Sequence, residues 1–342
     1  MPGIRALAAT KLGLESGGAS AGSAVVATRV WRGPVAMPED AREVTFVDEN
    51  VGYIGGGNRV ITYKEQANIS FPDTPATFEQ LPLVLMCAIE DVTAGTADGT
   101  GSGYTYQYDY PSSAKQSIRT MTIEGGDDQR VDEVNYAFVT DFTLAGAAGG
   151  PVNLSSNWTG RTVTDAEFST TGVTIPVVDE LVFSKSYLYI DSTIGSLGSS
   201  VQSETVLGFN FNSRSGWIPV FTAAGEPYFE FAKYVGNEEP TLEITFEHDA
   251  NAETEITAFR AETARAIRLD INGPALGTSD DGSTYTTKKV RIDAAGTWEN
   301  FSVIGEQDGN DIVTGTFRMR YDSTMDFRGQ IKVVNESETV ID

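Results

Sequence analysis

Apolar and polar residues alternate along much of the chain, as they do in strands that bury one face. The stretches "REVTFVDEN" and "RVITYKEQANISF" alternate on either side of the turn-rich "VGYIGGGN" and predict a hairpin with a wide loop. Further strands are predicted at "YTYQYDY", "SIRTMTIEG", "NYAFVTDFTLAG" and "PVNLSSNWTG". We therefore expect a mainly β protein, in keeping with its 35 glycines and its many Thr, Val and Ser residues.

Two stretches depart from this alternation and predict helices. In the first, "TFEQLPLVLMCAIE", Pro82 means that either the first turns are separate or the main helix begins at the proline. The same run holds the only cysteine, Cys87, so we expect a buried thiol and no internal disulfide. The second helix is expected to include "AFRAETARAIRLDI", where Arg260, Arg265 and Arg268 would lie near Glu262 on a solvated or subunit-facing surface.

The strand-then-helix pattern occurs twice, about half a chain apart. "ISFPD" at Ile69 begins the first copy and "ITFEHD" at Ile244 the second. Two further anchors follow in the same order, and they match "TMTIEGG" with "KVRIDAAG" and "VTDFTL" with "VTGTFRM". Because 342 residues also exceed the usual size of one core, we predict a duplicated folding unit. The expected parts are an N-terminal arm over 1–39, a first β domain over 40–161, a linker over 162–179 and a second β domain over 180–342.

The charge of the chain bears on its partners. Its formal net charge of −24 disfavours tight nucleic-acid binding, because affinity for phosphate rests on Lys and Arg. The N-terminus has no apolar core long enough for a signal peptide, and no segment is apolar enough to span a membrane, so we expect a soluble protein.

The search for catalytic chemistry is mostly negative. His248 is the only histidine, no G-x-S-x-G motif is present, and Cys87 is expected in the core, so no nucleophile–base pair is predicted. The acidic stretches "EQDGND", "SDDGS" and "EGGDDQ" lack the spacing of calcium loops and are expected to be turns. We therefore predict no enzyme and no catalytic, metal or cofactor residue.

The segment "RTMTIEGGDDQRVDEVNYAFVTDFTLAGAAGGPVNLSSNWTGR" resembles the tail tube (major tail) proteins of long-tailed phages. The opening "GIRALAATKLGLESGG", the helix "FEQLPLVLMCAIE" and the closing "GNDIVTGTFRMRYDSTMDFRGQIKVVNE" are also similar to members of that family. The resemblance implies a β-sandwich or β-barrel domain with a flanking helix, here present twice, in rings that stack into a hollow tube through which viral DNA passes.

Further expectations follow from this resemblance. The protein would belong to the virion tail and be assembled in the host cytoplasm. Its partners would be its own copies, the tape measure, tail terminator and baseplate proteins, and DNA that crosses the lumen without specific binding. Three two-domain chains would make a pseudo-hexameric ring, and a true hexamer is the alternative. An acidic lumen would suit passing DNA.

One glycine-rich loop is the candidate contact between rings, because stacking needs long loops that reach a neighbour. Its residues are Thr93, Ala94, Gly95, Thr96, Ala97, Asp98, Gly99, Thr100, Gly101, Ser102 and Gly103. Two other functions stay open. The chain could be another virion β-protein, such as a decoration, fibre or baseplate component. It could also be a carbohydrate-binding module or glycosidase that stacks Trp31, Trp158, Trp217 or Trp298 on sugars.

Overall fold

The protein is mainly β, as the alternation predicts, with 50% of its residues in strands and 9% in helical conformation, including two α-helices. The computed structural model describes residues 7–18, 21–52, 54–55, 57–112, 116–223, 225–236, 238, 240–279 and 282–341. No helix within these ranges is long and apolar enough to cross a membrane.

The elements fall into two series along the chain. The N-terminal series contains β1 (Ala9–Leu14), β2 (Arg29–Val30), β3 (Pro38–Asp40), β4 (Glu43–Phe46), β5 (Val60–Lys64), β6 (Ala67–Pro75), α1 (Leu81–Ala88), β7 (Thr96–Ala97), β8 (Tyr104–Asp109), β9 (Met121–Gly126), β10 (Val131–Ala147), β11 (Val152–Gly160) and β12 (Val163–Ala166). The C-terminal series contains β13 (Ser186–Asp191), β14 (Val206–Arg214), β15 (Trp217–Val220), β16 (Phe231–Tyr234), β17 (Thr241–Glu247), α2 (Ala250–Arg260), β18 (Arg265–Ala275), β19 (Thr287–Phe301), β20 (Gly305–Gln307), β21 (Asn310–Met319) and β22 (Gly329–Asn335).

The two series pair many of their strands in the same order. In the N-terminal series β1 pairs with β9, β9 with β10, β10 with β11 and β12, β11 with β6, β6 with β3, and β4 with β5. In the C-terminal series β13 pairs with β18, β18 with β19, β19 with β21 and β22, β21 with β17, β17 with β14, and β15 with β16. The helix also occupies the same place, since α1 follows β6 and α2 follows β17.

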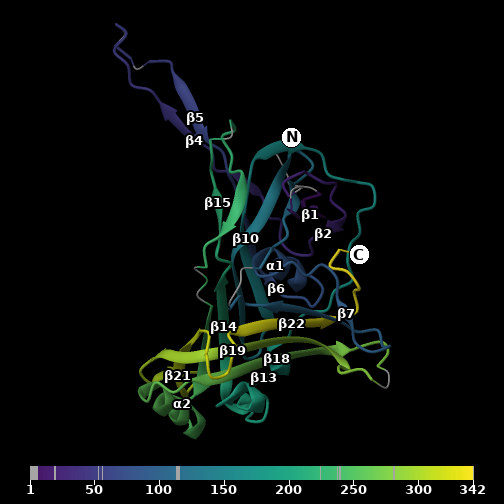
Figure 1. The fold of residues 1–342 in the computed structure, drawn as a ribbon, viewed down its shortest axis with the longest axis vertical. Coiled ribbons are helices and arrows are strands. Elements are labelled where there is room, and N and C mark those ends of the chain that lie inside the picture. The colour runs from purple at the N-terminus through teal and green to yellow at the C-terminus, as the bar shows by residue number, and fades with distance from the viewer. Residues whose placement is uncertain are drawn as a thin grey trace.

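Two pairings join the series into one antiparallel network. β14 pairs with the C-terminal half of β10, which makes a continuous sheet in the order β3-β6-β11-β10-β14-β17-β21-β19, called the long sheet below. β8 pairs with β22 and extends a second sheet, β8-β22-β19-β18-β13, called the cross sheet. Figure 1 shows β10 and β14 running along the long axis of the molecule, whereas β22, β19, β18 and β13 run across it.

The core lies on the apolar face of the long sheet, where aromatic side chains from both series meet. Phe142 of β10 and Phe211 of β14 are both 1% exposed, and their ring centroids are 6.1 Å apart. All eight residues of α1 are buried, and the helix begins at Leu81 with Pro82 in its first turn, where a proline is tolerated. The predicted burial of Cys87 is confirmed, and burial raises the pKa of its thiol well above the ordinary value.

The prediction of a helix through "ARAIRLDI" is wrong. The Asp249 carboxylate caps the N-terminus of α2 by accepting from two backbone N–H groups, and the helix ends at Arg260. Glu262 then has a φ of 53°, which breaks the helix and turns the chain into β18. Arg265 and Arg268 therefore lie on a strand, and they do not form a helical patch around Glu262.

Parts of the predicted arm and linker belong to the sheets. β1 lies within residues 1–39, and it pairs with β9 and buries Leu12. β12 lies within residues 162–179 and pairs with β10. The three matched sequence pairs that predict a duplication fare differently. The first pair matches equivalent elements, β6–α1 with β17–α2. The other two match β9 with β19 and β10 with β21, which occupy different places in the pairing order.

Candidate assembly surfaces

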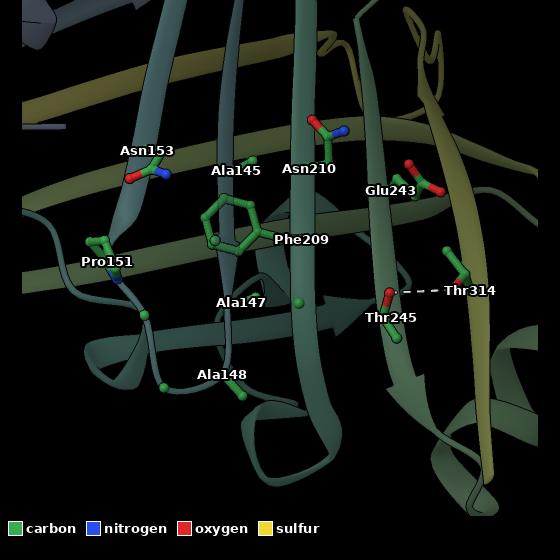
Figure 2. Close-up of a pocket in the computed structure, with 14 residues that line it drawn as sticks. Ala145, Ala147, Ala148, Pro151, Asn153, Phe209, Asn210, Glu243, Thr245 and Thr314 are labelled. Atoms are coloured by element: carbon green, nitrogen blue, oxygen red, sulfur yellow. Dashed lines mark hydrogen bonds between the residues drawn. The ribbon is translucent and has the colours of Figure 1, made fainter. Parts of the chain in front are cut away.

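The long sheet has one polar face, which is opposite the core. Its strands β11, β10, β14, β17 and β21 alternate between buried apolar residues and amide or hydroxyl residues that point outward. Figure 2 shows part of this face, with Asn153, Asn210 and Glu243 in front of the crossing strands. The residues line a shallow hollow of about 640 Å³ that ends at the turn between β10 and β11.

Side chains on this face bind one another across the strands. Asn157 donates to Asp141 over 2.8 Å, Asn212 donates to Thr143 over 2.9 Å, and the Thr245 and Thr314 hydroxyls lie 3.2 Å apart. The outward charged residues include the carboxylates of Asp73, Asp141, Glu243, Glu247 and Glu299 and the guanidinium groups of Arg214 and Arg318. Arg318 is paired with Glu299 over 2.8 Å. The face is therefore polar, and carboxylates outnumber arginines on it.

The hairpin β4–β5 is the second surface of note. It projects from the body at one end of the molecule, as Figure 1 shows. Its apolar residues are uncovered: Phe46 is 75% exposed, Ile54 110%, Val60 53%, Ile61 47% and Tyr63 57%. An exposed apolar stretch of this size marks a contact surface. The sequence predicts the hairpin. The adjacent apolar residues Val60 and Ile61, which point to opposite faces of the strand, are the signal that it would expose apolar side chains.

The corresponding hairpin in the C-terminal series, β15–β16, is held against the body at Phe229, although Ile218 and Phe231 stay 44% and 43% exposed. It packs on β10, where Phe229 is fully buried against Tyr136 and Phe138 at ring-centroid distances of 5.2 and 6.0 Å. Arg161 stabilises this contact through a cation–π interaction, since its guanidinium lies 4.4 Å from the centroid of the Tyr136 ring. Its Nε donates to the backbone oxygen of Phe229 over 2.9 Å, and a terminal nitrogen donates to the oxygen of Glu230.

The loop from Thr93 to Gly103 lies against its own chain. β7 within it pairs with β8, and the backbone N–H of Gly95 donates to the oxygen of Glu338 over 2.8 Å. Asp98 is 9% exposed, and its carboxylate accepts from the backbone N–H groups of Thr284 and Tyr285 over 2.9 and 2.7 Å. The loop thus contacts β8 and the segment between β18 and β19 of its own chain. Its contact with another ring stays a prediction.

A buried ionic cluster joins the two series. Lys288, at the start of β19, is 7% exposed and donates to Glu79 and Asp179, each over 2.6 Å. Glu79 precedes α1, and Asp179 lies in the connecting segment. Burial alone would lower the pKa of Lys288, but the hydrogen bonds that it donates to both carboxylates raise it. The lysine therefore stays charged and holds the two series together.

The histidine and two of the acidic stretches considered for chemistry lie at the start of α2 and in hairpin turns, respectively. His248 Nε2 lies 2.8 Å from Glu253 Oε1 in the first turn of α2. In the turn between β20 and β21, Asp308 and Gly309 have φ angles of 52° and 84°, as expected for a tight hairpin. Among the described residues, no three His, Cys, Asp or Glu side chains form a group that could hold a metal ion.

Comparisons with known protein families and with curated proteins give no match to this chain.

Proposed function

We propose that the protein is a tail tube protein of a long-tailed virus, with two tandem tube-like β domains that form rings and stack into a hollow tube. The observation that carries this proposal is the repeated pairing order, in which one sheet runs through both series. Within the described residues, this sheet ends at β3 on one side and at the C-terminal half of β19 on the other. In a closed assembly of identical chains, such edges have partners.

The two ends of the long sheet are candidates for joining neighbouring chains. β3 pairs with β6 on one side, and the C-terminal half of β19 pairs with β21 on one side. Inside the chain, β10 is the equivalent of β19, and β14 is the equivalent of β3. The C-terminal half of β10 pairs with β11 on one side and with β14 on the other, so one series is joined to the next there. Repeating this junction between chains makes a ring, and we propose three chains per ring, with a six-chain ring as the alternative.

The polar face of the long sheet suits the wall of the channel. DNA would meet amides, hydroxyls and an excess of carboxylates over arginines, and it would pass without the arginine and lysine contacts that retain phosphate. This composition is in keeping with the acidic lumen expected from the net charge.

The remaining parts of the proposal concern partners and place. The virion tail, assembled in the host cytoplasm, is the proposed location, and tape measure, tail terminator and baseplate proteins are the proposed partners. The loop Thr93–Gly103 is the contact between rings suggested by the sequence. Another virion β-protein, such as a decoration or fibre component, is the alternative, and it predicts compact particles.

Electron microscopy of the purified chain tests the proposal directly. We expect hollow rods built from rings, and compact particles at all concentrations would contradict it. Asn210→Cys then tests whether the polar face lines the channel. Native Cys87 is buried, so it should contribute little to thiol labelling. In rods, biotin-maleimide should label Cys at position 210 but streptavidin should not reach it. Gln129→Cys, which is exposed at the turn between β9 and β10, is the matched control and should bind streptavidin.

A further inference from the structure

Arg161 and Arg320 occupy equivalent places in the two series. Each follows the last residue of its strand, β11 or β21. The backbone N–H of Arg161 donates to the oxygen of Asn135 over 3.0 Å, and that of Arg320 donates to the oxygen of Ala295 over 2.9 Å. Asn135 lies on β10 and Ala295 on β19, which also hold the same place in the pairing order.

The surroundings of the two arginines differ in one respect. Arg161 is covered by the β15–β16 hairpin, to which it donates two hydrogen bonds. Arg320 is exposed and lines an open hollow of about 520 Å³ with Arg318, Arg328 and Tyr321. Its side chain makes no hydrogen bond or ion pair with any residue in the part of the chain that the structure describes. A hairpin over Arg320 is thus missing from the isolated chain.

The β4–β5 hairpin of a second copy could cover Arg320. β4–β5 follows β3 and precedes β6, just as β15–β16 follows β14 and precedes β17. β15–β16 buries Phe229 against the N-terminal series, whereas Phe46 of β4–β5 is 75% exposed. Of the three arginines in the hollow, Arg318 is paired with Glu299 and Arg328 with Glu238, so Arg320 is the one without an ion pair among the described residues. The loop of β4–β5 offers the carboxylate of Asp48, which has the opposite charge.

We propose that the β4–β5 hairpin of one copy docks over Arg320 of a second copy, as β15–β16 docks over Arg161 within one chain. The Arg320 guanidinium donates to backbone oxygens of the hairpin, and the apolar hairpin residues become covered. This inference rests on the repeated arrangement proposed above, and it assigns the residues of the contact between chains. It does not depend on what passes through the ring.

Two variants test the contact without disturbing the core. Arg320→Ala removes the anchor, Phe46→Ser removes an exposed apolar side chain, and Arg260→Ala is the matched control at an exposed arginine on α2. Sedimentation velocity over a concentration series should show about a tenfold or greater rise in the concentration for half-assembly in the first two variants, as for loss of a central interface residue. The control should match wild type, and circular dichroism at a concentration below that of assembly should give the same melting temperature for all four proteins.

Hydrogen exchange supplies an independent readout. Backbone amides of residues 43–64 should gain protection when wild-type protein assembles. If wild type assembles while both variants assemble equally well and these amides stay unprotected, the docking inference is overturned and the ring proposal stands. If wild type forms no oligomer at any concentration, the ring proposal fails, and the docking inference fails with it.

Discussion

The ammonium group of Lys288 donates to the carboxylate of Glu79 over 2.6 Å, although 209 positions separate the two residues in the chain. The pair is almost fully buried and connects β19 with the segment before α1. Asp179 provides a second carboxylate from the connecting segment. A buried charge of this kind is tolerated only while its partners are in place, so the cluster ties the two series to one relative position.

Lys288→Met should therefore destabilise the fold strongly. The substitution keeps the length of the side chain but leaves Glu79 buried without its cation, which costs about 3–5 kcal/mol of unfolding free energy. Urea denaturation measures the change. Lys233→Ala, at an exposed lysine on β16, is the control and should shift stability by less than about 0.5 kcal/mol. Equal stability of the two variants would show that the cluster does not hold the series together.

The sequence predicts features that depend on local pattern and misses those that depend on long-range pairing. The β4–β5 hairpin follows from its alternation, and the start of α1 follows from Pro82. The good helix formers of "ARAIR" are compatible with a helix through Arg265, but pairing with β19 overrides that propensity. β1 was missed because its six residues sit in a Gly- and Ala-rich segment, and only β9 makes them a strand.

The candidate site was predictable to a smaller extent. The amide and hydroxyl residues of the polar face alternate visibly in "VNLSSNW" and "LGFNFNS". Which strands lie side by side, and hence that these residues form one face, follows from the β10·β14 pairing between distant segments. The equivalence of Arg161 and Arg320 depends on the same pairing order, because the residues around them share no obvious motif.

Asp270 should make stability depend on acid pH. Burial alone would raise its pKa, but hydrogen bonds and charge from Arg291 and Lys289 outweigh burial and lower it. A carboxyl whose folded pKa is depressed stabilises the fold above its unfolded pKa of about 3.9, and this contribution is lost as pH falls through the folded value. Asp270→Asn should lower the melting temperature at pH 7 and flatten its dependence between about pH 5 and pH 2. An unchanged slope would mean that other carboxylates control acid unfolding.

Arg161→Ala should loosen the β15–β16 hairpin without unfolding the chain. The variant loses the stacking on Tyr136 and two hydrogen bonds to backbone oxygens, which together are worth about 2–3 kcal/mol. Hydrogen exchange should accelerate in residues 217–234 and stay unchanged in β22. Arg161→Lys keeps the charge but not the planar stack, so it should rescue only part of the protection.

Glu255 should stabilise the packing of α2 against β18 and β19. Its carboxylate is 6% exposed and accepts from the Trp298 indole N–H over 2.8 Å and from Arg265 over 3.0 Å. Glu255→Ala leaves a buried N–H and a partly buried guanidinium without an acceptor, at a cost of about 3 kcal/mol. Glu255→Gln retains one acceptor oxygen and should cost less. Trp298 fluorescence during chemical unfolding measures both variants, and equal losses would mean that packing alone seats the helix.

Deletion of residues 93–103 separates the two roles open to that loop. Removing Asp98 takes away the acceptor of the Thr284 and Tyr285 N–H groups, so the deletion should lower stability by about 1–3 kcal/mol. If the loop also joins rings, the deletion should shorten or abolish rods, whereas Asp98→Ala should destabilise the chain by a similar amount and still give rods. Rods of normal length from the deletion variant would leave the loop a purely internal brace.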